Sequence, residues 1–321
     1  MRAIALISGG LDSTLAAKFI QSQGIEVLGL YFQIPFSDAN NTLPDLGIEV
    51  KCVDIEETFL ETIKNPEYGF GSNMNPCIDC KILMLTKAKE LMSELAAKFV
   101  ITGEVLGQRP MSQNKQALYN IERGARLEGL VLRPLSAKFL LETIPEKEGW
   151  VNRNKLLDFN GRGRKSQMVL AWELGIKKYT QPAGGCLLTD PEFAKRLKDL
   201  ISHQELSINN VELLKLGRHF RLSKNAKLIV GRNEKENKHL VDLAKEDDYL
   251  FMPVDILGPK ALGRGIFSED LIKLACGITC RYCDLNGQIN TQITYRKVSV
   301  AREERLKVLS LEETQLAQLR I

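Results

Sequence analysis

Residues 3–19 read AIALISGGLDSTLAAKF, and they decide the fold of the first half of the chain. An apolar run ends at Ser8, two glycines follow, and apolar residues then recur at helical spacing from Leu15 onward. Glycine lets the backbone close around a ligand, and the free N–H groups at the start of a helix face an anion. This stretch therefore predicts a strand, an anion-binding turn and a helix.

The turn carries more polar and flexible residues than a plain connection needs: Ser8, Gly9, Gly10, Asp12 and Ser13. The two hydroxyls add donors for phosphate oxygens, whereas a carboxylate fits there only when a divalent cation bridges it to the phosphates. The spacing differs from the Walker P-loop and brings no lysine. Because capping a helix requires only one such side chain, the turn favours a nucleotide site with Asp12 on the metal side.

Strand and helix patterns alternate beyond this turn. The stretches 25–32 and 47–55 are typical of strands, residues 80–98 form the strongest helix pattern of the chain, and the strand pattern 99–105 follows at once. Such alternation predicts an α/β domain with a Rossmann-like parallel sheet. Cys52, alone within a strand pattern, is expected to be a small core residue.

The chain has 321 residues, of which 44% are hydrophobic, so two domains are expected. We place the boundary between a larger domain, 1–203, and a smaller α+β domain, 204–321. No apolar run is long enough for a membrane span and no signal peptide is apparent, which predicts a cytoplasmic protein without a membrane partner. Seven cysteines, five of them in two clusters, favour metal or redox chemistry over a disulfide scaffold.

The motif SGGLDS at 8–13 resembles the PP-loop of the ATP pyrophosphatase superfamily, whose members grip the pyrophosphate of ATP and transfer AMP to a substrate oxygen. The resemblance implies ATP and Mg²⁺ as cofactors. It implies that the metal binds Asp12 and that the pyrophosphate binds Ser8, Gly9, Gly10 and Ser13. It leaves the substrate open, because lysidine synthetases, deazaguanine nitrile synthases and tRNA thiouridylases share the motif.

The stretch TGEVLGQRPMSQ at 102–113 is similar to a segment of tRNA 4-thiouridine synthetases, and LRPLSAK at 132–138 resembles the segment that follows it there. This implies an ATP-dependent tRNA sulfurtransferase that adenylates a uridine carbonyl oxygen and replaces it with sulfur to form 4-thiouridine, with a tRNA 2-thiouridylase as the alternative. Gly103 would then be part of the ATP-binding site, and Gln113 would be part of the RNA-binding site. Sulfide or a cysteine desulfurase would be the sulfur donor. The chain starts directly at the PP-loop strand, so we expect neither a THUMP region nor a rhodanese-like domain.

Three cysteines bear on the sulfur chemistry. Cys77 and Cys80 form a C-x-x-C at the start of the strong helix, and Cys186 follows two glycines far downstream. Two thiolates at this spacing can share a metal or a cluster, and a third can approach them from a flexible loop. The set resembles that of short, iron–sulfur-dependent tRNA thiolation enzymes, which implies a 4Fe-4S cluster. A persulfide relay with Cys186 as the carrier, and a zinc site, are the alternatives.

Residues 109–165 are rich in basic side chains, most densely in NGRGRKSQ at 160–167. We expect four of them to hold the tRNA backbone: Arg109, Arg162, Arg164 and Lys165. A solvated basic surface without a partner is the alternative.

Residues 213–244 and 257–265 look similar to an RNA-binding domain of ribosome quality-control factors. The resemblance implies that this domain captures tRNA, with candidates Arg218, His219, Arg221, Lys224 and Arg232. A packing or dimerisation domain is the alternative, and a homodimer is expected by analogy only.

A last cysteine cluster, CGITCRYC, contains Cys276, Cys280 and Cys283. The spacing is that of a radical-SAM site, but only about forty residues follow it, too few for the barrel that such a site requires. A second metal site and a packed apolar stripe on a helix stay open. The cluster also keeps a deazaguanine nitrile synthase as an alternative, and an RNA-binding protein with a nucleotide-sensing PP-loop is the alternative outside enzymes.

Overall fold

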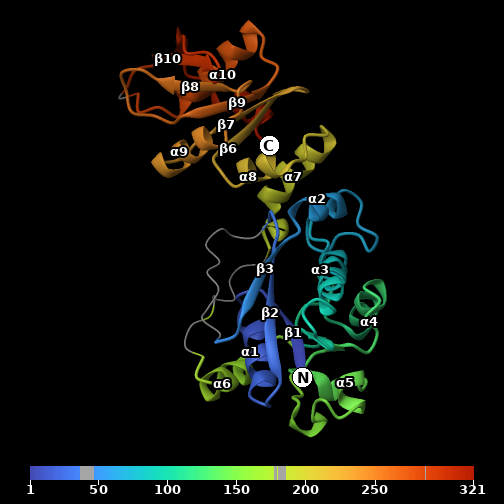
Figure 1. The fold of residues 1–321 in the computed structure, drawn as a ribbon. Helices are drawn as coiled ribbons and strands as arrows, with labels where there is room; N and C mark the ends of the chain where they lie inside the picture. Colours follow the sequence, from blue (N-terminus) through green and yellow to red (C-terminus); the bar gives the residue numbers. More distant parts are fainter. Residues whose placement is uncertain (37–46, 177–178, 180–185, 286) are drawn as a thin grey trace. The chain divides into compact units, whose positions relative to one another are not determined.

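The computed structural model describes residues 1–36, 47–176, 179, 186–285 and 287–321 (Figure 1). The chain divides into two compact units, Met1–Asp190 and Pro191–Ile321. The functional division between 1–203 and 204–321 stays a prediction. No helix among the described residues is long and apolar enough to cross a membrane.

A five-stranded sheet forms the centre of the first unit, in the order β3-β2-β1-β4-β5. All its pairings are parallel, which confirms the predicted α/β fold. The strands are β1 (Arg2–Ile7), β2 (Glu26–Gln33), β3 (Val50–Asp54), β4 (Phe99–Ile101) and β5 (Val131–Leu132). Because β1 lies in the middle of this sheet, both of its faces are covered, and its run of apolar residues follows from that position.

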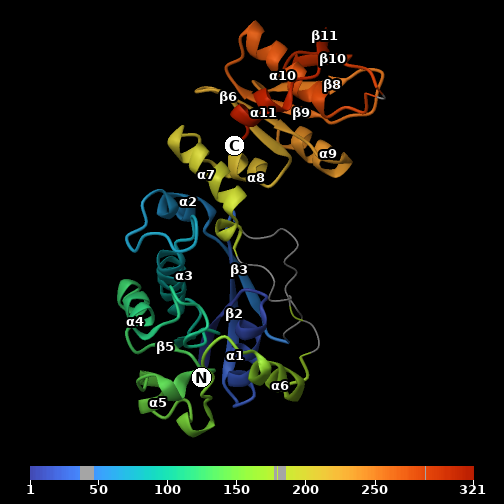
Figure 2. The ribbon, with the colours of Figure 1, turned by 180° about the vertical axis from the view of Figure 1, so that it is seen from behind.

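Helices cover both faces of the sheet, as Figures 1 and 2 show. They are α1 (Leu11–Gln21), α2 (Glu56–Lys64), α3 (Cys77–Met92), α4 (Lys115–Gly124), α5 (Ile144–Lys147) and α6 (Lys165–Glu173). Ala3, Ala5 and Ile7 of β1 pack in one apolar core with α1 and α6. Ile4 packs in the other core with α3 and α4. The strand period of two thus separates the two layers of helices.

Cys52 is exposed on β3, so its prediction as a core residue was wrong. The strand pattern around it was correct. However, β3 is the last strand at one edge of the sheet, where fewer elements cover a side chain.

The second unit begins with the helices α7 (Pro191–Ser202) and α8 (Ile208–Leu214) and continues into a six-stranded antiparallel sheet. The strand order is β11-β10-β8-β9-β7-β6. The strands are β6 (Arg218–Ser223), β7 (Ala226–Val230), β8 (Tyr249–Pro253), β9 (Ala261–Gly265), β10 (Asn290–Lys297) and β11 (Glu304–Leu309). The remaining helices are α9 (Glu234–Asp242), α10 (Glu269–Arg281) and α11 (Glu313–Leu319). This arrangement confirms the predicted smaller α+β domain.

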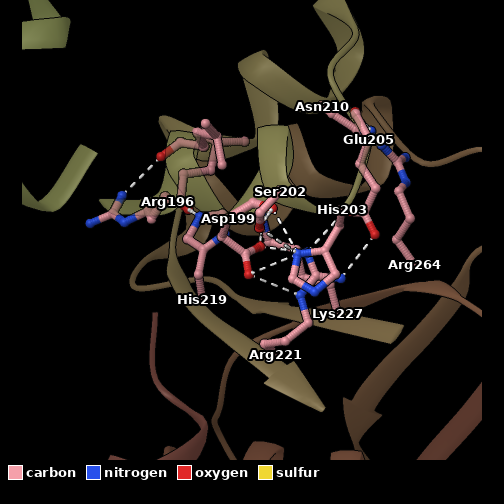
Figure 3. A network of polar contacts seen from close by, with 12 residues as sticks. Arg196, Asp199, Ser202, His203, Glu205, Asn210, His219, Arg221, Lys227 and Arg264 are labelled. Atoms are coloured by element: carbon pink, nitrogen blue, oxygen red, sulfur yellow. Dashed lines mark hydrogen bonds and ion pairs between the residues drawn. The ribbon is translucent and has the colours of Figure 1, made fainter. Parts of the chain in front are cut away.

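A polar network joins α7 and the residues after it to this sheet (Figure 3). Arg221 of β6 forms ion pairs with Asp199 of α7, and with Glu205 at 2.9 Å. Lys227 of β7 is buried 3.9 Å from Asp199. Burial lowers the pKa of Lys227 to about 8, although the two carboxylates oppose that shift. The network fixes α7 on the sheet within the second unit.

The same network changes two RNA-binding expectations. His219 is 1% exposed, its Nε2 lies 2.7 Å from the Leu216 carbonyl oxygen, and burial lowers its pKa well below the usual value. Arg221 is occupied by two carboxylates. The buried His219 side chain is not available to RNA, so this part of the prediction was wrong, whereas an RNA contact of the partly exposed Arg221 stays a prediction.

Cys276 and Cys280 of α10, and Cys283 two residues after its end, lie in or beside the apolar core of the second unit. Cys276 and Cys280 are fully buried there, and Cys283 packs against the same core. Burial, with a smaller effect of Cys280, raises the pKa of Cys276 and of Cys283 to about 12. This environment favours the packed apolar stripe over a second metal site.

Candidate functional site

The PP-loop turn lies where β1 ends and α1 begins, at the carboxyl edge of the parallel sheet. Gly9 has a φ of +76°, a conformation that favours glycine. The Ser13 hydroxyl donates to the Gly10 carbonyl oxygen at 3.0 Å and accepts from the Ser8 N–H at 3.2 Å. The turn is therefore preformed by its own side chains.

Gly103 lies against this turn, directly after Thr102 at the end of the neighbouring strand β4. A Cβ atom at Gly103 would lie 2.4 Å from the backbone of Asp12 and Ser13, too close for any side chain. Glycine is thus required here so that the segment after β4 can lie against the first turn of α1. The structure brings together Gly103 and the PP-loop as the sequence predicts, while a contact of Gly103 with ATP stays a proposal.

A cavity of about 800 Å³ opens at this edge of the sheet. One part of its wall is apolar, with Tyr31, Phe32, Ile34, Phe36, Phe59 and Met84. The polar part contains most of the predicted site residues: Ser8, Gly10, Asp12, Ser13, Cys77, Cys80, Gly103, Arg109, Gln113, Arg164 and Cys186. Segments more than 170 residues apart in sequence, from Ser8 to Cys186, thus face one space.

One carboxylate oxygen of Asp12 accepts a hydrogen bond, and the other has no hydrogen-bond partner among the described residues. Its Oδ2 accepts a hydrogen bond of 3.0 Å from Gln108 Nε2. Its Oδ1 is buried without a hydrogen-bond partner among the described residues. Burial raises the pKa of the carboxyl group, and the amide of Gln108 with the charges of Arg164 and Arg109 opposes the rise. A buried oxygen that lacks a partner at a cavity fits a cation ligand.

Three of the four cysteines of the first unit, Cys77, Cys80 and Cys186, line the same cavity. Burial raises the pKa of the Cys80 thiol well above its usual value, and Cys186 and Cys77 raise it further. The pKa of Cys186 is raised to about 11 by burial and by Cys77, against the effects of the Leu188 backbone and Arg109. The gathering of Cys77, Cys80 and Cys186 agrees with the sequence expectation.

Backbone contacts fix the segment that carries Cys186. Met74 N–H donates to the Leu188 carbonyl oxygen at 3.1 Å, and Asn73 Nδ2 donates to the Thr189 carbonyl oxygen at 2.7 Å. The thiol of Cys77 donates to Asn75 Oδ1 at 3.1 Å. Residues 73–77 therefore connect the C-x-x-C to the segment of the third cysteine.

The three thiols do not form a finished metal site. Across the part of the chain that the structure describes, no three His, Cys, Asp or Glu side chains have a geometry that could hold a metal ion. The donor set itself, with three soft thiol ligands in one cavity, suits iron or zinc. The chemistry of the residues thus fits a metal group, and binding it would require the thiols to lose protons and move together.

A buried ion network next to the cavity was missed by the sequence analysis. Glu104 accepts from Lys81, from Arg133 Nε at 2.8 Å and from Thr102 Oγ1 at 3.0 Å. Burial alone would raise the pKa of Glu104, but Lys81 and Arg133 outweigh it and hold this pKa at about 2. Arg133 also pairs with Glu122. The network fixes Lys81, which follows Cys80, at the cavity wall.

The four predicted RNA-binding cations separate into two pairs. Arg109 and Arg164 line the cavity. Arg162 and Lys165 are exposed and lie outside its wall. Gln113 is 5% exposed and lines the cavity, and its Oε1 has no partner among the described residues.

Comparisons with known proteins match the two parts of the chain to different families. Residues 1–138 match the family model of the thiamine biosynthesis protein ThiI, and residues 217–320 match that of the NFACT protein RNA binding domain. The tRNA-specific 2-thiouridylase MnmA of Sulfurimonas denitrificans is 30% identical over 113 residues, which is 31% of this chain and 33% of that protein. MnmA of Nitratiruptor sp. is 27% identical over 164 residues, 47% of each chain.

Among solved structures, a 4-thiouridine synthetase in complex with RNA and bound ATP is 19% identical with a TM-score of 0.37. The match covers 67% of this chain and 52% of that chain. The chain thus spans between a third and a half of the length of the curated relatives named above.

The fold and the cavity define an α/β unit with a candidate nucleotide site, followed by an α+β unit. More particularly, residues 1–138 are similar to the ThiI family, residues 217–320 are similar to the NFACT protein RNA binding domain, and MnmA proteins are distant relatives.

Proposed function

We propose that this protein is an ATP-dependent tRNA sulfurtransferase that forms 4-thiouridine. The observation that carries the proposal is the shared cavity of the PP-loop, residues of the 102–113 stretch and three cysteines. The matches of residues 1–138 to ThiI and of 217–320 to an RNA-binding domain support it. So do the relatives named as tRNA-specific 2-thiouridylases.

Activation of the uridine is the first task. A uracil carbonyl oxygen is a poor leaving group, but its adenylated form leaves as AMP. The backbone N–H groups of Gly9 and Gly10 and the hydroxyls of Ser8 and Ser13 would hold the pyrophosphate of ATP. The free Oδ1 of Asp12 would hold Mg²⁺, which neutralises phosphate charge. Fixed positions of these groups would lower the barrier to attack on the α-phosphorus.

Supply of sulfur is the second task. Cys77, Cys80 and Cys186 would hold a 4Fe-4S cluster, which supplies an iron atom able to bind hydrosulfide from sulfide or a cysteine desulfurase. The raised thiol pKa values of Cys80 and Cys186 mean that these ligands must lose protons when the cluster binds. A persulfide relay on Cys186 is the alternative that the same cavity supports. A zinc site is weaker, since His203, His219 and His239 all belong to the second unit.

Capture of tRNA is assigned to both units. Arg162 and Lys165 are exposed cations beside the PP-loop cavity, and Gln113 lies in its wall for contact with the target nucleotide. In the second unit the exposed Lys224 and Arg232 keep this role. Arg218 also stays a candidate, with its guanidinium 4.4 Å from the centre of the Tyr282 ring.

Three alternatives differ from this proposal, one in the product and two in the class of protein. The MnmA relatives make 2-thiouridine the alternative position. A deazaguanine nitrile synthase would not need the gathered Cys77, Cys80 and Cys186. A nucleotide-sensing RNA-binding protein would not need a sulfur site at all.

Substitution of cysteines tests the proposal. The full-length protein is reconstituted anaerobically with iron and sulfide and then incubated with ATP, Mg²⁺, sulfide and unmodified tRNA, and nucleosides are analysed by mass spectrometry. Cys186→Ala is expected to abolish thiolation while MgATP binding stays within about twofold of wild type. Cys52→Ala, at an exposed cysteine of the same unit, is the control and should keep full activity. Full thiolation by the Cys186 variant would contradict the assigned sulfur site.

A further inference from the structure

We propose that Arg164 and Arg109 bind the triphosphate of ATP and not the backbone of tRNA, while Arg162 and Lys165 keep the tRNA role. This inference rests on the proposed use of ATP and assigns the cations that the adenylation step requires. The basic residues of the stretch 109–165 would then serve two functions, ATP binding and tRNA binding.

The packing of α6 brings Arg164 to the PP-loop. Leu170 and Ala171 of α6 share an apolar core with Leu15 and Ala16 of α1, the helix that starts at the PP-loop. Arg164 immediately precedes α6 and lines the same cavity as Asp12. The contact between the two helices thus delivers a guanidinium to the turn across about 150 residues of sequence.

Arg109 reaches the same cavity from the loop after β4. Hydrogen bonds fix this loop: Gly107 N–H donates to the Gln113 carbonyl oxygen at 2.7 Å, and Gln113 N–H donates to that of Arg109 at 2.9 Å. The neighbouring Gln108 is bound to Asp12. Arg109 thus lines one cavity together with Asp12 and Cys186.

Charge balance supports a bound polyanion. Arg133 and Arg221, two other enclosed arginines, are each paired with two carboxylates. Among the described residues no carboxylate lies within ion-pair distance of Arg109 or Arg164, and no other hydrogen-bond partner is found for their guanidinium groups. The Glu104 charge at the cavity wall is already balanced by Lys81 and Arg133. The cavity therefore has two guanidinium groups to offer to an anion.

ATP supplies that anion. The PP-loop contains no Walker lysine, so cationic contacts to the phosphates must come from other segments. Guanidinium groups bind phosphate through paired, charge-assisted hydrogen bonds. The two unpaired arginines at the PP-loop meet this need, whereas an exposed tRNA backbone would require cations outside the cavity, as Arg162 and Lys165 are.

The reaction gives each arginine a role. The uracil carbonyl oxygen bonds to the α-phosphorus, the bond between the α-phosphorus and the bridging oxygen to the β-phosphorus breaks, and its electron pair leaves with pyrophosphate. The proton on N3 of the ring passes to solvent. Arg164, which lines the cavity beside the PP-loop, stabilises the charge that grows on pyrophosphate. Arg109, which lines the same cavity as Cys186, holds the α-phosphate that later leaves as AMP.

Matched methionine variants of the full-length protein test the assignment. Affinity for MgATP is measured by calorimetry, affinity for tRNA by filter binding at two salt concentrations, and folding by circular dichroism. Arg164→Met and Arg109→Met are each expected to weaken MgATP binding about tenfold or more and to leave tRNA affinity within about twofold. Arg162→Met, two residues from Arg164, should show the reverse and a shallower salt dependence of tRNA binding.

Two further results complete the test. Arg164→Lys should restore part of the MgATP affinity, because it keeps the charge but not the paired donors. If Arg164→Met weakens tRNA binding and leaves MgATP binding unchanged, the assignment is overturned. Absence of thiouridine with normal MgATP affinity in the wild type would contradict the proposed function alone, and absence of MgATP binding in the wild type would contradict both.

Discussion

The side-chain amide of Gln108 donates a hydrogen bond of 3.0 Å to Oδ2 of Asp12, across 96 residues of sequence. This contact joins the PP-loop to the loop after β4 and orients the carboxylate so that Oδ1 stays free. Gln108→Leu removes the amide, so Asp12 loses its fixed orientation. We expect MgATP affinity to fall about tenfold, measured by calorimetry. Gln116→Leu, at an exposed amide of α4, should leave the affinity unchanged, and equal losses in both variants would contradict this role.

The close approach of Gly103 to the PP-loop gives a second prediction. In Gly103→Ala the new Cβ would lie 2.4 Å from the backbone of Asp12 and Ser13, so the turn must shift. MgATP binding should drop at least tenfold, while far-ultraviolet circular dichroism stays that of the wild type. Gly163→Ala is the control, because a Cβ at Gly163 has no neighbour within 4 Å and its φ is not positive. Unchanged MgATP affinity in Gly103→Ala would refute the tight packing of Gly103 against the first turn of α1.

The network around Arg221 predicts a loss of stability. Arg221→Met leaves the carboxylates of Asp199 and Glu205 without their shared cation at a site where the arginine side chain is 13% exposed. The free energy of unfolding should fall by about 3 kcal/mol, measured by urea unfolding of the full chain. Arg232→Met breaks an ion pair whose arginine is 44% exposed, and it should cost less than about 1 kcal/mol. A smaller loss for Arg221→Met than for the control would show that the network does not hold α7 on the sheet.

Lys227 predicts a pH dependence of stability. Burial lowers its pKa from 10.5 in the unfolded chain to about 8 in the folded chain. Between these values the unfolded chain holds a proton that the folded chain has released, so stability rises with pH across this window. The charged groups that act on Lys227 are Asp199 and Glu205, which raise its pKa, and Arg221 and Arg196, which lower it.

The measurement compares wild type with Lys227→Met. Urea unfolding at pH 8 and at pH 10.5 should show a rise of about 3 kcal/mol for the wild type relative to the variant. The difference removes the contributions of cysteines and tyrosines that titrate in the same range. Parallel curves for the two proteins would mean that Lys227 keeps its usual pKa in the folded chain.

The sequence predicted the architecture well where the signal is local. The apolar run of β1, the glycines after it and the alternating patterns up to residue 105 correspond to a parallel sheet with the PP-loop at its carboxyl edge. Cys52 was placed in the core because a strand pattern does not reveal which strand lies at the edge. His219 and Arg221 were expected to contact RNA because they lie in a basic stretch of the sequence. The residues of β6 alone do not reveal that His219 is buried or that Arg221 pairs with Asp199 and Glu205.

The site was only partly predictable from sequence. Motif resemblance brought Cys77, Cys80 and Cys186 together, and the structure places all three at one cavity. The pairing of Glu104 with Lys81 and Arg133 depends on contacts between distant segments, which produce no periodicity in the sequence. Arg164 lines the cavity and Arg162 does not. This difference depends on the packing of α6 on α1, which the sequence pattern does not show.

The central claim is that a uridine carbonyl oxygen is adenylated and then replaced by sulfur. The most direct measurement uses tRNA transcribed with heavy oxygen at both uracil carbonyl positions, incubated with the reconstituted protein, MgATP and sulfide. The account predicts that 4-thiouridine appears and that an equal amount of AMP carries one heavy oxygen, detected by mass spectrometry. Thiouridine formed with unlabelled AMP, or no thiouridine at all beside intact MgATP binding, would contradict it.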